Sequence, residues 1–372
     1  MKRISVIVGT RPEAIKLAPL IIALRKQSGV ILSVCITGQH TDMVQSVLEV
    51  FEITPDKDFS VMGKTNNLND LTGLLLSKFQ EYYLDFKPDI IVVQGDTSSV
   101  FAGAVAAFNL HIPVAHVEAG LRSNNLESPW PEEGIRRMVT QIASYHFTPT
   151  SESAENIKSS GVTNSTIEVS GNTVIDALHQ AIKLIEEGST NLNLPNLLRE
   201  LTGRKMVLVT GHRRENFGDG LHNLCVAIAT LAKAHPEYEF IFPVHLNPVV
   251  QSQVKEFFSE LTHTNVHLIE PLPYLEFVWL MKNSHFIITD SGGIQEEAPS
   301  LGKPVLVTRD TTERPEGVQA GTVVLVGKDS SILIQEALRL MEDELYYKKM
   351  SQAVNPYGDG KSVERIIKTL IG

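Results

Sequence analysis

The sequence predicts an α/β protein made of two Rossmann-like domains, each with a doubly wound parallel sheet. Three observations support this fold class. Strand-type runs rich in Val and Ile alternate with amphipathic segments of helical periodicity along the whole chain. Several of these runs are almost continuously apolar, which is typical of parallel strands covered on both faces. Finally, 372 residues exceed what one hydrophobic core usually supports.

The first half of the chain begins this alternation, with each apolar run bounded by polar residues. The expected strands are Ile4–Val8, Leu32–Thr37, Ile90–Gln94, Val114–Glu118 and Tyr145–Thr148. Apolar residues at helical spacing predict helices over Ala14–Ser28, Leu68–Asp85 and Thr97–Asn109.

The second half repeats the pattern, which indicates a second sheet of the same kind. Its expected strands are Met206–Thr210, Phe240–Val244, Val266–Leu268, Phe286–Thr289, Val305–Thr308 and Val323–Val326. The expected helices are Leu221–His235 and Ser330–Lys348.

A domain boundary is expected near the Ser-Gly-Asn-Thr segment at 170–173, because a helix over Val174–Gly188 and a polar stretch then precede the second series of strands. The first domain is therefore residues 1–170 and the second 171–355. The tail holds a turn at 356–360 and a final helix, and we expect the segment 356–372 to cross back to the first domain.

Composition narrows the class of protein. The formal net charge of -10 argues against a nucleic-acid partner, which would require a basic face. Cys35 and Cys225 each lie within an apolar run and are interpreted as small core residues in a reducing compartment. No apolar run approaches the ~20 residues that span a bilayer, and the chain enters a strand at Ile4 without a signal peptide. We therefore expect a cytoplasmic protein without a membrane partner.

The segment Thr289–Glu297 (TDSGGIQEE) is the most informative motif. It follows an expected strand and opens an expected helix, so backbone N–H groups and the helix dipole favour an anion there. Two glycines would let a diphosphate approach the backbone, and a later carboxylate could bind the two hydroxyls of a ribose. The alternative is an ordinary capped helix, but a double glycine with a double acid exceeds what a cap requires.

Polar residues gather where the expected strands end, and ligands of open parallel sheets bind beyond those carboxyl ends. In the first half these residues are Arg11, Lys16, Gln39, His40, Asp96 and Glu118. In the second half they are His212, Arg213, His245, Asp290 and Ser291. Two such edges facing one another would form a cleft lined with acids, arginines and a histidine.

Each of these residues also has an ordinary structural interpretation. A single acid at a strand end is often a turn or cap residue. Asp96 and Glu118 together are better candidates for a functional site, because both are expected to reach the same crevice. Glu132 follows Pro129-Trp130-Pro131 and could simply be a first-turn acid favoured by the helix dipole. His212 could be a core or capping histidine, but its Gly-His-Arg-Arg-Glu-Asn setting is too polar for a core position.

Some motifs are missing from the sequence. No G-x-G-x-x-G segment follows a strand, so a dinucleotide fingerprint is absent. Neither a paired Cys/His cluster nor an H-x-x-x-H motif with a glutamate suggests zinc. We therefore expect no cofactor and no metal.

The motifs together resemble the bacterial non-hydrolysing UDP-N-acetylglucosamine 2-epimerases over nearly the whole chain. They are GTRPEAIK (9–16), GDT (95–97), HVEAGLR (116–122), SPWPEE (128–133), GNTVID (171–176), TGHRRE (210–215), PVHLNP (243–248), TDSGGIQEEAPSLGKP (289–304), RDTTERPE (309–316) and NPYGDG (355–360). The resemblance implies a GT-B-like pair of domains, an active site in the interdomain cleft, and a homodimer.

The resemblance also implies roles for residues. The diphosphate would be held by Ser291, Gly292 and Gly293, the ribose by Glu297 and the uracil by Phe277. Around the phosphates and sugar would lie Arg11, Lys16, His212 and Arg314. The catalytic acids would be Asp96, Glu118 and Glu132, with His212 beside the departing diphosphate. A second, activating UDP-GlcNAc site would involve Gln39, His40 and His245.

The expected reaction is the reversible conversion of UDP-GlcNAc to UDP-ManNAc for cell-envelope polysaccharides. The C2 hydrogen of the sugar is not acidic, and no nicotinamide site is visible for a transient oxidation. Elimination of UDP to 2-acetamidoglucal, followed by re-addition, is the remaining route. It needs cationic and N–H groups at the diphosphate and carboxylates as acid and base. A hydrolysing 2-epimerase and a GT-B glycosyltransferase are the alternatives.

Overall fold

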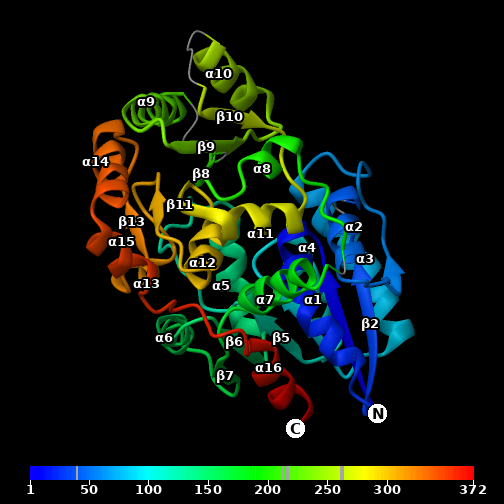
Figure 1. Cartoon of the computed structure of the whole chain (residues 1–372). Helices are drawn as coiled ribbons and strands as arrows, with labels where there is room; N and C mark the ends of the chain where they lie inside the picture. The colour runs from blue at the N-terminus through cyan, green and yellow to red at the C-terminus, as the bar shows by residue number, and fades with distance from the viewer. Residues whose placement is uncertain (39–40, 189, 212, 214–217, 260–263) are drawn as a thin grey trace. The chain divides into compact units, whose positions relative to one another are not determined.

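The computed structural model describes residues 1–372 except 39–40, 189, 212, 214–217 and 260–263, and it describes no side chains at 41–42. The chain forms two compact units, one of residues 1–180 with 357–372 and one of residues 181–356. Each unit contains its own parallel sheet with flanking helices, labelled along the chain in Figure 1. The predicted fold class, two Rossmann-like α/β domains, is confirmed.

The sheet of the first unit contains seven strands within the described residues, in the order β3-β2-β1-β4-β5-β6-β7. Neighbouring strands in this order pair in parallel, and the order reverses direction between β1 and β4. The strands are β1 (Lys2–Val8), β2 (Val30–Ile36), β3 (Lys57–Asp58), β4 (Ile90–Gln94), β5 (Val114–Val117), β6 (Tyr145–Thr148) and β7 (Thr166–Val169).

Helices of the first unit connect these strands and cover the sheet. They are α1 (Arg11–Arg25), α2 (Thr41–Val50), α3 (Leu68–Phe86), α4 (Ser98–Asn109), α5 (Glu132–Ile142), α6 (Ser151–Ser159), the first part of α7 (Thr173–Glu186), which continues into the second unit, and α16 (Ser362–Ile371). Ile7, Ile91 and Val93 of the sheet pack in one buried cluster with residues of α3, α4 and α5. The neighbouring residues of β1 point to the opposite face because side chains alternate along a strand.

The second unit repeats the design with the strand order β10-β9-β8-β11-β12-β13, again parallel, and reverses direction between β8 and β11. Its strands are β8 (Lys205–Thr210), β9 (Tyr238–Pro243), β10 (Val266–Ile269), β11 (Ser284–Thr289), β12 (Val305–Val307) and β13 (Val323–Leu325). Its helices are α8 (Asn196–Glu200), α9 (Asp219–Ala234), α10 (Pro248–Ser259), α11 (Tyr274–Asn283), α12 (Gly292–Ser300), α13 (Pro315–Gln319), α14 (Ser330–Glu342) and α15 (Glu344–Ser351).

The expected strands all form, with ends shifted by at most two residues, but two details differ from the prediction. β3 and β7 were not expected, because β3 has only two residues, both charged, and β7 begins with a polar residue. The helix predicted over Ser330–Lys348 is wrong as a single element. It breaks at Asp343, whose backbone is extended and whose side chain accepts the N–H of Tyr346 to cap a new helix, α15.

The C-terminal segment lies against α7 within the first unit. Asp176 of α7 accepts the backbone N–H groups of Ser362 and Val363 at 3.2 and 3.0 Å, and these are the first two residues of α16. A side chain of one helix therefore caps another helix that lies almost two hundred residues away in sequence.

Two bulk expectations can be compared with the structure. Cys35 and Cys225 are both buried with free thiols, as predicted for core residues. Among the helices formed by the described residues, none has the length and hydropathy needed to cross a membrane.

Candidate active site

The first sheet reverses its strand order between β1 and β4, where a ligand of such a sheet is expected to bind. A loop of Gly9 and Thr10 connects β1 to α1, which starts at Arg11. A Cβ on Gly9 would lie 2.5 Å from the Ser99 hydroxyl, so the close contact of this loop with α4 requires glycine. The packing of this loop therefore fixes the position of Arg11, the first residue of α1.

Glu13 holds this loop from within α1. Its carboxylate accepts the N–H of Gly9 at 2.6 Å and the hydroxyl of Thr10 at 3.0 Å. The side chain is buried, and burial raises its pKa to about 7, although these hydrogen bonds oppose the rise. The sequence alone predicts no special role for Glu13, because an acid in a first helical turn has an ordinary dipole explanation.

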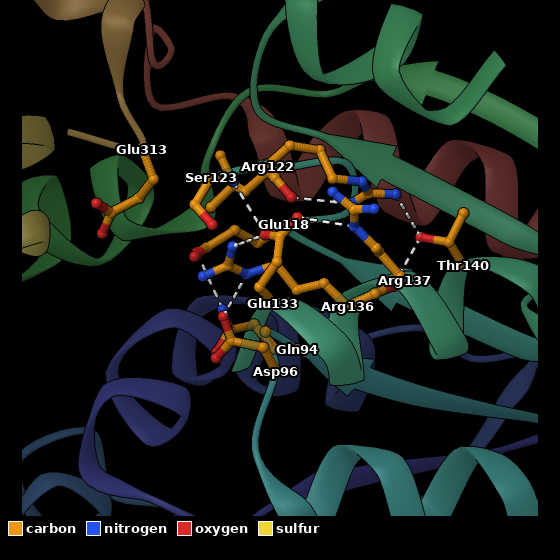
Figure 2. Close-up of polar contacts among 12 residues, drawn as sticks. Gln94, Asp96, Glu118, Arg122, Ser123, Glu133, Arg136, Arg137, Thr140 and Glu313 are labelled. Carbon is orange, nitrogen blue, oxygen red and sulfur yellow. Dashed lines mark hydrogen bonds and ion pairs between the residues drawn. The ribbon is translucent and has the colours of Figure 1, made fainter. Parts of the chain in front are cut away.

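Asp96 lies two residues beyond β4 and is one-quarter exposed (Figure 2). Its Oδ2 accepts Nε of Arg136 at 2.6 Å. Its loop is held by His116 of β5, whose Nε2 lies 2.7 Å from the carbonyl oxygen of Gly95 and therefore donates to it. Burial lowers the pKa of His116 to about 4, so this ring is neutral at pH 7.

Arg136 of α5 joins Asp96 to a second carboxylate (Figure 2). Its Nη1 donates to Glu133 at 2.8 Å, and Glu133 also accepts Nε of Arg137 and the N–H of Ser123, both at 2.9 Å. Burial opposes ionisation of Glu133, but this backbone bond and the two guanidinium groups outweigh it and lower its pKa. Arg136 therefore connects Asp96 to Glu133 in the first turn of α5.

Glu118 follows β5 directly and adopts a left-handed backbone with φ of 62°. Such a conformation is uncommon for a residue with a long side chain and costs about 1–3 kcal/mol. Its Oε2 accepts Nζ of Lys16, Nε2 of Gln94 at 3.0 Å and Nδ2 of Asn172 at 3.1 Å. Three donors on one oxygen stabilise the ionised carboxylate and set its direction.

Glu132 is the first residue of α5, one residue after Pro131. Its Oε2 is buried, and the described residues offer it no hydrogen-bond partner. Glu132 and Arg136 are four residues apart on α5 and so lie on the same side of the helix. The contact between Arg136 and Asp96 connects α5 to the loop after β4, and Glu118 follows β5, which pairs with β4 in the sheet.

In the second unit, Ser291 precedes α12 without using its side chain as a cap within the described part of the chain. Its own N–H donates to the Thr289 hydroxyl at 2.9 Å. The first N–H groups of α12, which begins at Gly292, point out of the helix start and carry its positive dipole end. Anion binding at this helix start stays a prediction from the sequence.

Arg314 lies directly over Gly292. A Cβ on Gly292 would be 2.5 Å from Nη1 of Arg314, so only glycine permits this approach. The guanidinium donates to Glu296 at 2.5 Å and to Glu313 at 2.6 Å. Burial disfavours the charge of Glu313, but Arg314, together with Arg309 and Arg213, holds its pKa far below its usual range. A cation is thus fixed at the start of α12.

Glu297 and Phe277 are the other predicted contacts in this unit. Glu297 is buried on α12 and its Oε1 accepts the hydroxyl of Tyr274 at 3.3 Å. Phe277 is half-buried and lies three residues after Tyr274 on α11, hence on the same side of that helix. Gly293 has room for a Cβ, whose nearest neighbour would be Oε2 of Glu297 at 3.7 Å.

The remaining predicted residues are less informative. Gln39, His40 and His212 lie outside the described residues. His245 is exposed after β9, and its Nδ1 accepts the N–H of Asn247 at 3.1 Å. Arg213 donates its N–H to Asp290 at 2.8 Å and so links the loops that follow β8 and β11. Within the described ranges, no group of three or more His, Cys, Asp or Glu side chains is arranged to hold a metal ion.

The residues that hold the acids could not be predicted from the sequence. Arg136 sits in an apparently amphipathic helix, and Asn172 has the ordinary explanation of a residue before a helix start. Neither the Arg136–Asp96 contact, across 40 residues, nor the Asn172–Glu118 contact, across 54, leaves a local signal. The first unit thus gathers carboxylates of the kind that transfer protons, and the second unit, taken by itself, has a helix start of the kind that binds anions.

Comparison with known proteins gives consistent results. A family model described as UDP-N-acetylglucosamine 2-epimerase matches residues 22–371. The UDP-N-acetylglucosamine 2-epimerase of Campylobacter jejuni is 47% identical over 100% of this chain and 98% of its own. Among solved structures, the Neisseria meningitidis UDP-GlcNAc 2-epimerase bound to UDP-GlcNAc superposes with a TM-score of 0.91 at 45% identity, covering 100% of both chains. The Methanocaldococcus jannaschii UDP-GlcNAc 2-epimerase in complex with UDP-GlcNAc and UDP gives 0.84 at 36% identity, covering 99% of both.

Proposed function

The chain belongs to the UDP-N-acetylglucosamine 2-epimerase family, and we propose that it interconverts UDP-GlcNAc and UDP-ManNAc through elimination and re-addition of UDP, without net hydrolysis. The product would serve the synthesis of cell-envelope polysaccharides. The similarity to structures of relatives that contain UDP-GlcNAc and UDP supports these ligands.

The proposed elimination balances without an oxidant. The C1–O bond breaks with its electron pair on the UDP oxygen, a carboxylate removes the C2 proton, and the C2–H electrons form the C1=C2 bond of 2-acetamidoglucal. In the return direction a carboxylic acid delivers a proton to the opposite face of C2 and UDP attacks C1. Because the enzyme both takes and gives a proton, it needs at least two carboxyl groups in complementary protonation states.

Asp96, Glu118 and Glu132 are the proposed proton-transfer groups. Their surroundings differ, since Asp96 contacts a guanidinium, Glu118 has three donors on one oxygen, and Glu132 has a buried oxygen that the described residues leave without a partner. Different surroundings push apart the proton affinities of acids in one site. The environment of Glu118 is the observation that carries the proposal. Its backbone is left-handed, and three donors bind one oxygen of its carboxylate.

The second unit supplies the proposed nucleotide contacts. The start of α12, from Ser291 through Gly293, would hold the diphosphate with Arg314 beside it, and His212 and Arg11 would add to the charge stabilisation of departing UDP. Glu297 would bind the ribose and Phe277 the uracil. Lys16, which the resemblance assigns to the phosphates and sugar, donates to Glu118 in this structure, so we propose that it also orients that acid.

The proposal is tested by incubating the purified protein with UDP-GlcNAc in deuterated water without added cofactor. Proton NMR should show UDP-ManNAc together with loss of the C2 proton signal from both sugar nucleotides. E118Q, which keeps the shape but not the charge of the acid, should lose most of this exchange. Release of free ManNAc would instead indicate a hydrolysing enzyme, and turnover only with an added acceptor would indicate a glycosyltransferase.

Gln39, His40 and His245 remain a proposed second UDP-GlcNAc site that activates the enzyme. A steady-state rate curve tests it. We expect a sigmoidal dependence on UDP-GlcNAc that becomes hyperbolic in H245A, and a hyperbolic curve for the unaltered chain would remove the proposal without affecting the epimerase assignment.

A further inference from the structure

The chain re-enters the first unit at Tyr357, and this residue contacts the segment that precedes α7. The carbonyl of Tyr357, a fully buried residue, accepts the N–H of Asn172 at 2.7 Å. Gly171 packs equally closely, because a Cβ there would lie 2.7 Å from the Ser362 hydroxyl and 3.3 Å from Cα of Gly358. The tail turn and the residues before α7 are therefore in direct backbone contact.

Further contacts fix the tail in this position. Asp176 caps α16 through Ser362 and Val363. A Cβ on Gly360 would lie 2.2 Å from Nδ1 of His179, so the turn presses against α7 at a second point. Arg365 donates to the carbonyl of Ser170 at 3.0 Å. The tail is thus anchored on both sides of Asn172.

Asn172 also reaches Glu118. Its Oδ1 accepts the N–H of Val174 at 3.1 Å, and its Nδ2 donates to Oε2 of Glu118 at 3.1 Å. Only this orientation of the amide pairs its oxygen with a donor and its nitrogen with a carboxylate. Asn172 is 1% exposed, so both hydrogen bonds are shielded from water and their loss would leave buried polar atoms unpaired.

We propose that Asn172 is a positioning residue that connects the C-terminal turn to Glu118 and so makes residues 357–372 part of the catalytic apparatus without any contact with substrate. The inference rests on the proposed function only in treating Glu118 as a proton-transfer group. Of the three donors to Glu118, Lys16 comes from α1 and Gln94 from β4, whereas Asn172 lies in the segment bound by the tail. Glu118 needs such support because its left-handed backbone alone does not fix its carboxylate.

Asn172→Ser separates a positioning role from a structural one. Serine keeps a side-chain oxygen that can cap α7 at Val174, but it is too short to reach Glu118. We expect kcat to fall about 10- to 100-fold, as for a displaced catalytic group, with KM within about threefold and the thermal midpoint lowered by only about 2–6 °C, because one buried hydrogen bond is lost. Asn223→Ser is the matched control, because it removes an amide donor to the carbonyl of Lys328 in the second unit, and it should leave kcat unaltered.

Asn172→Asp supplies a second readout. It keeps the capping oxygen but places a negative charge beside Glu118, which favours protonation of that residue. The acidic limb of the pH–rate profile should move to higher pH, a change that a purely structural role would not produce. Lys16, the charged group that also faces Glu118, makes this shift smaller without reversing it.

Crystal structures of the unaltered chain and Asn172→Ser provide a test that does not depend on activity. We expect the Glu118 carboxylate to leave its present direction while the tail turn stays in place. An unmoved Glu118, or a kcat equal to that of the unaltered chain, would overturn the inference. Absence of epimerisation by the unaltered chain would instead overturn the proposed function, and the displacement of Glu118 would still decide the positioning role.

Discussion

At the residue scale, the acids of the first unit are defined by the donors around them more than by their own positions at strand ends. Arg136 shows this most clearly, since the residue is 4% exposed, its guanidinium donates to Asp96 and Glu133, and Glu133 is fully buried. Buried ion pairs do not always add stability, but removing one partner leaves the other charge without compensation.

We therefore expect Arg136→Gln to lower the free energy of unfolding by about 3 kcal/mol and to reduce kcat strongly, because Asp96 loses its contact with the guanidinium of Arg136. Urea unfolding and steady-state kinetics measure the two effects. The double variant Glu133→Gln/Arg136→Gln is the control, since it removes both buried charges. It should recover part of the stability but not the activity, and equal stability of the single and double variants would contradict the charge argument.

The two adjacent glycines at the start of α12 differ in their surroundings, so we expect alanine substitutions at them to have different effects on stability. A Cβ on Gly292 would lie 2.5 Å from Arg314, whereas the nearest atom to one on Gly293 is 3.7 Å away. Gly292→Ala should displace Arg314 from its two carboxylates and lower the free energy of unfolding by about 2 kcal/mol, a typical cost of forced repacking. Gly293→Ala should be neutral or stabilising by up to about 1 kcal/mol, since alanine is the better helix former.

Chemical denaturation of the two variants without ligand measures these changes in the free energy of unfolding. Titration with UDP measures separately how each substitution affects nucleotide binding. If a diphosphate approaches both backbone N–H groups, each alanine weakens UDP binding, even where stability is unaffected. Equal stability losses for Gly292→Ala and Gly293→Ala would show that the contact with Arg314 does not set the requirement for glycine.

At the scale of elements, α16 depends on a cap that its own sequence does not supply. Lys361 precedes the helix, and in the described residues its side chain provides no cap hydrogen bond, whereas Asp176 of α7 accepts two of the helix's first N–H groups. This arrangement makes the attachment of the C-terminal helix sensitive to a single carboxylate.

Asp176→Ala should destabilise the docked α16 by about 1–2 kcal/mol, the usual value of a cap, and Asp176→Asn should cost less because one acceptor oxygen remains. Hydrogen exchange of the amides in 362–371 measures the change locally. We expect faster exchange there than in α9, which serves as an internal reference. Unchanged protection of α16 in Asp176→Ala would show that packing alone holds the helix.

Elements were predictable from the sequence where the physical signal is local. Runs such as Ile90–Gln94 indicate buried parallel strands directly, because such strands must be apolar on both faces. The two residues of β3, Lys57 and Asp58, carry no such signal. Asp96 and Glu118 were likewise predicted from strand ends, but Arg136 and Asn172 were not, since their partners are fixed by how helices pack on the sheet and not by neighbours in sequence.

For the whole molecule, histidines that are buried or half-buried contribute to the response of stability to acid. Burial lowers the pKa values of His116, His146 and His285 to about 4 in the folded chain, against an ordinary value of 6.5. The unfolded chain therefore binds more protons between these two values. Stability contributed by the neutral rings is complete above about pH 6.5 and is lost as the pH falls towards 4.

His146→Gln should make the free energy of unfolding less dependent on pH in this window by up to about 1.4 kcal/mol per pH unit, the equivalent of one proton. Denaturation series at several pH values between 4 and 7 give the slope. Glu13 has the opposite effect on the pH dependence of stability. Its pKa is raised to about 7 in the folded chain, so its contribution to the free energy of unfolding is lost as the pH rises through that value. An unchanged slope in His146→Gln would mean that this ring takes up no proton on unfolding.

The return of the chain to its first unit has a consequence for biosynthesis. Residues 357–372 follow the entire second unit in the order of translation, yet they complete the first one. On the ribosome, the second unit has all its residues available for folding as soon as residue 356 has emerged. The first unit, although its synthesis starts earlier, lacks its last helix until the end of translation. The half of the protein that is made first is therefore the half that is finished last.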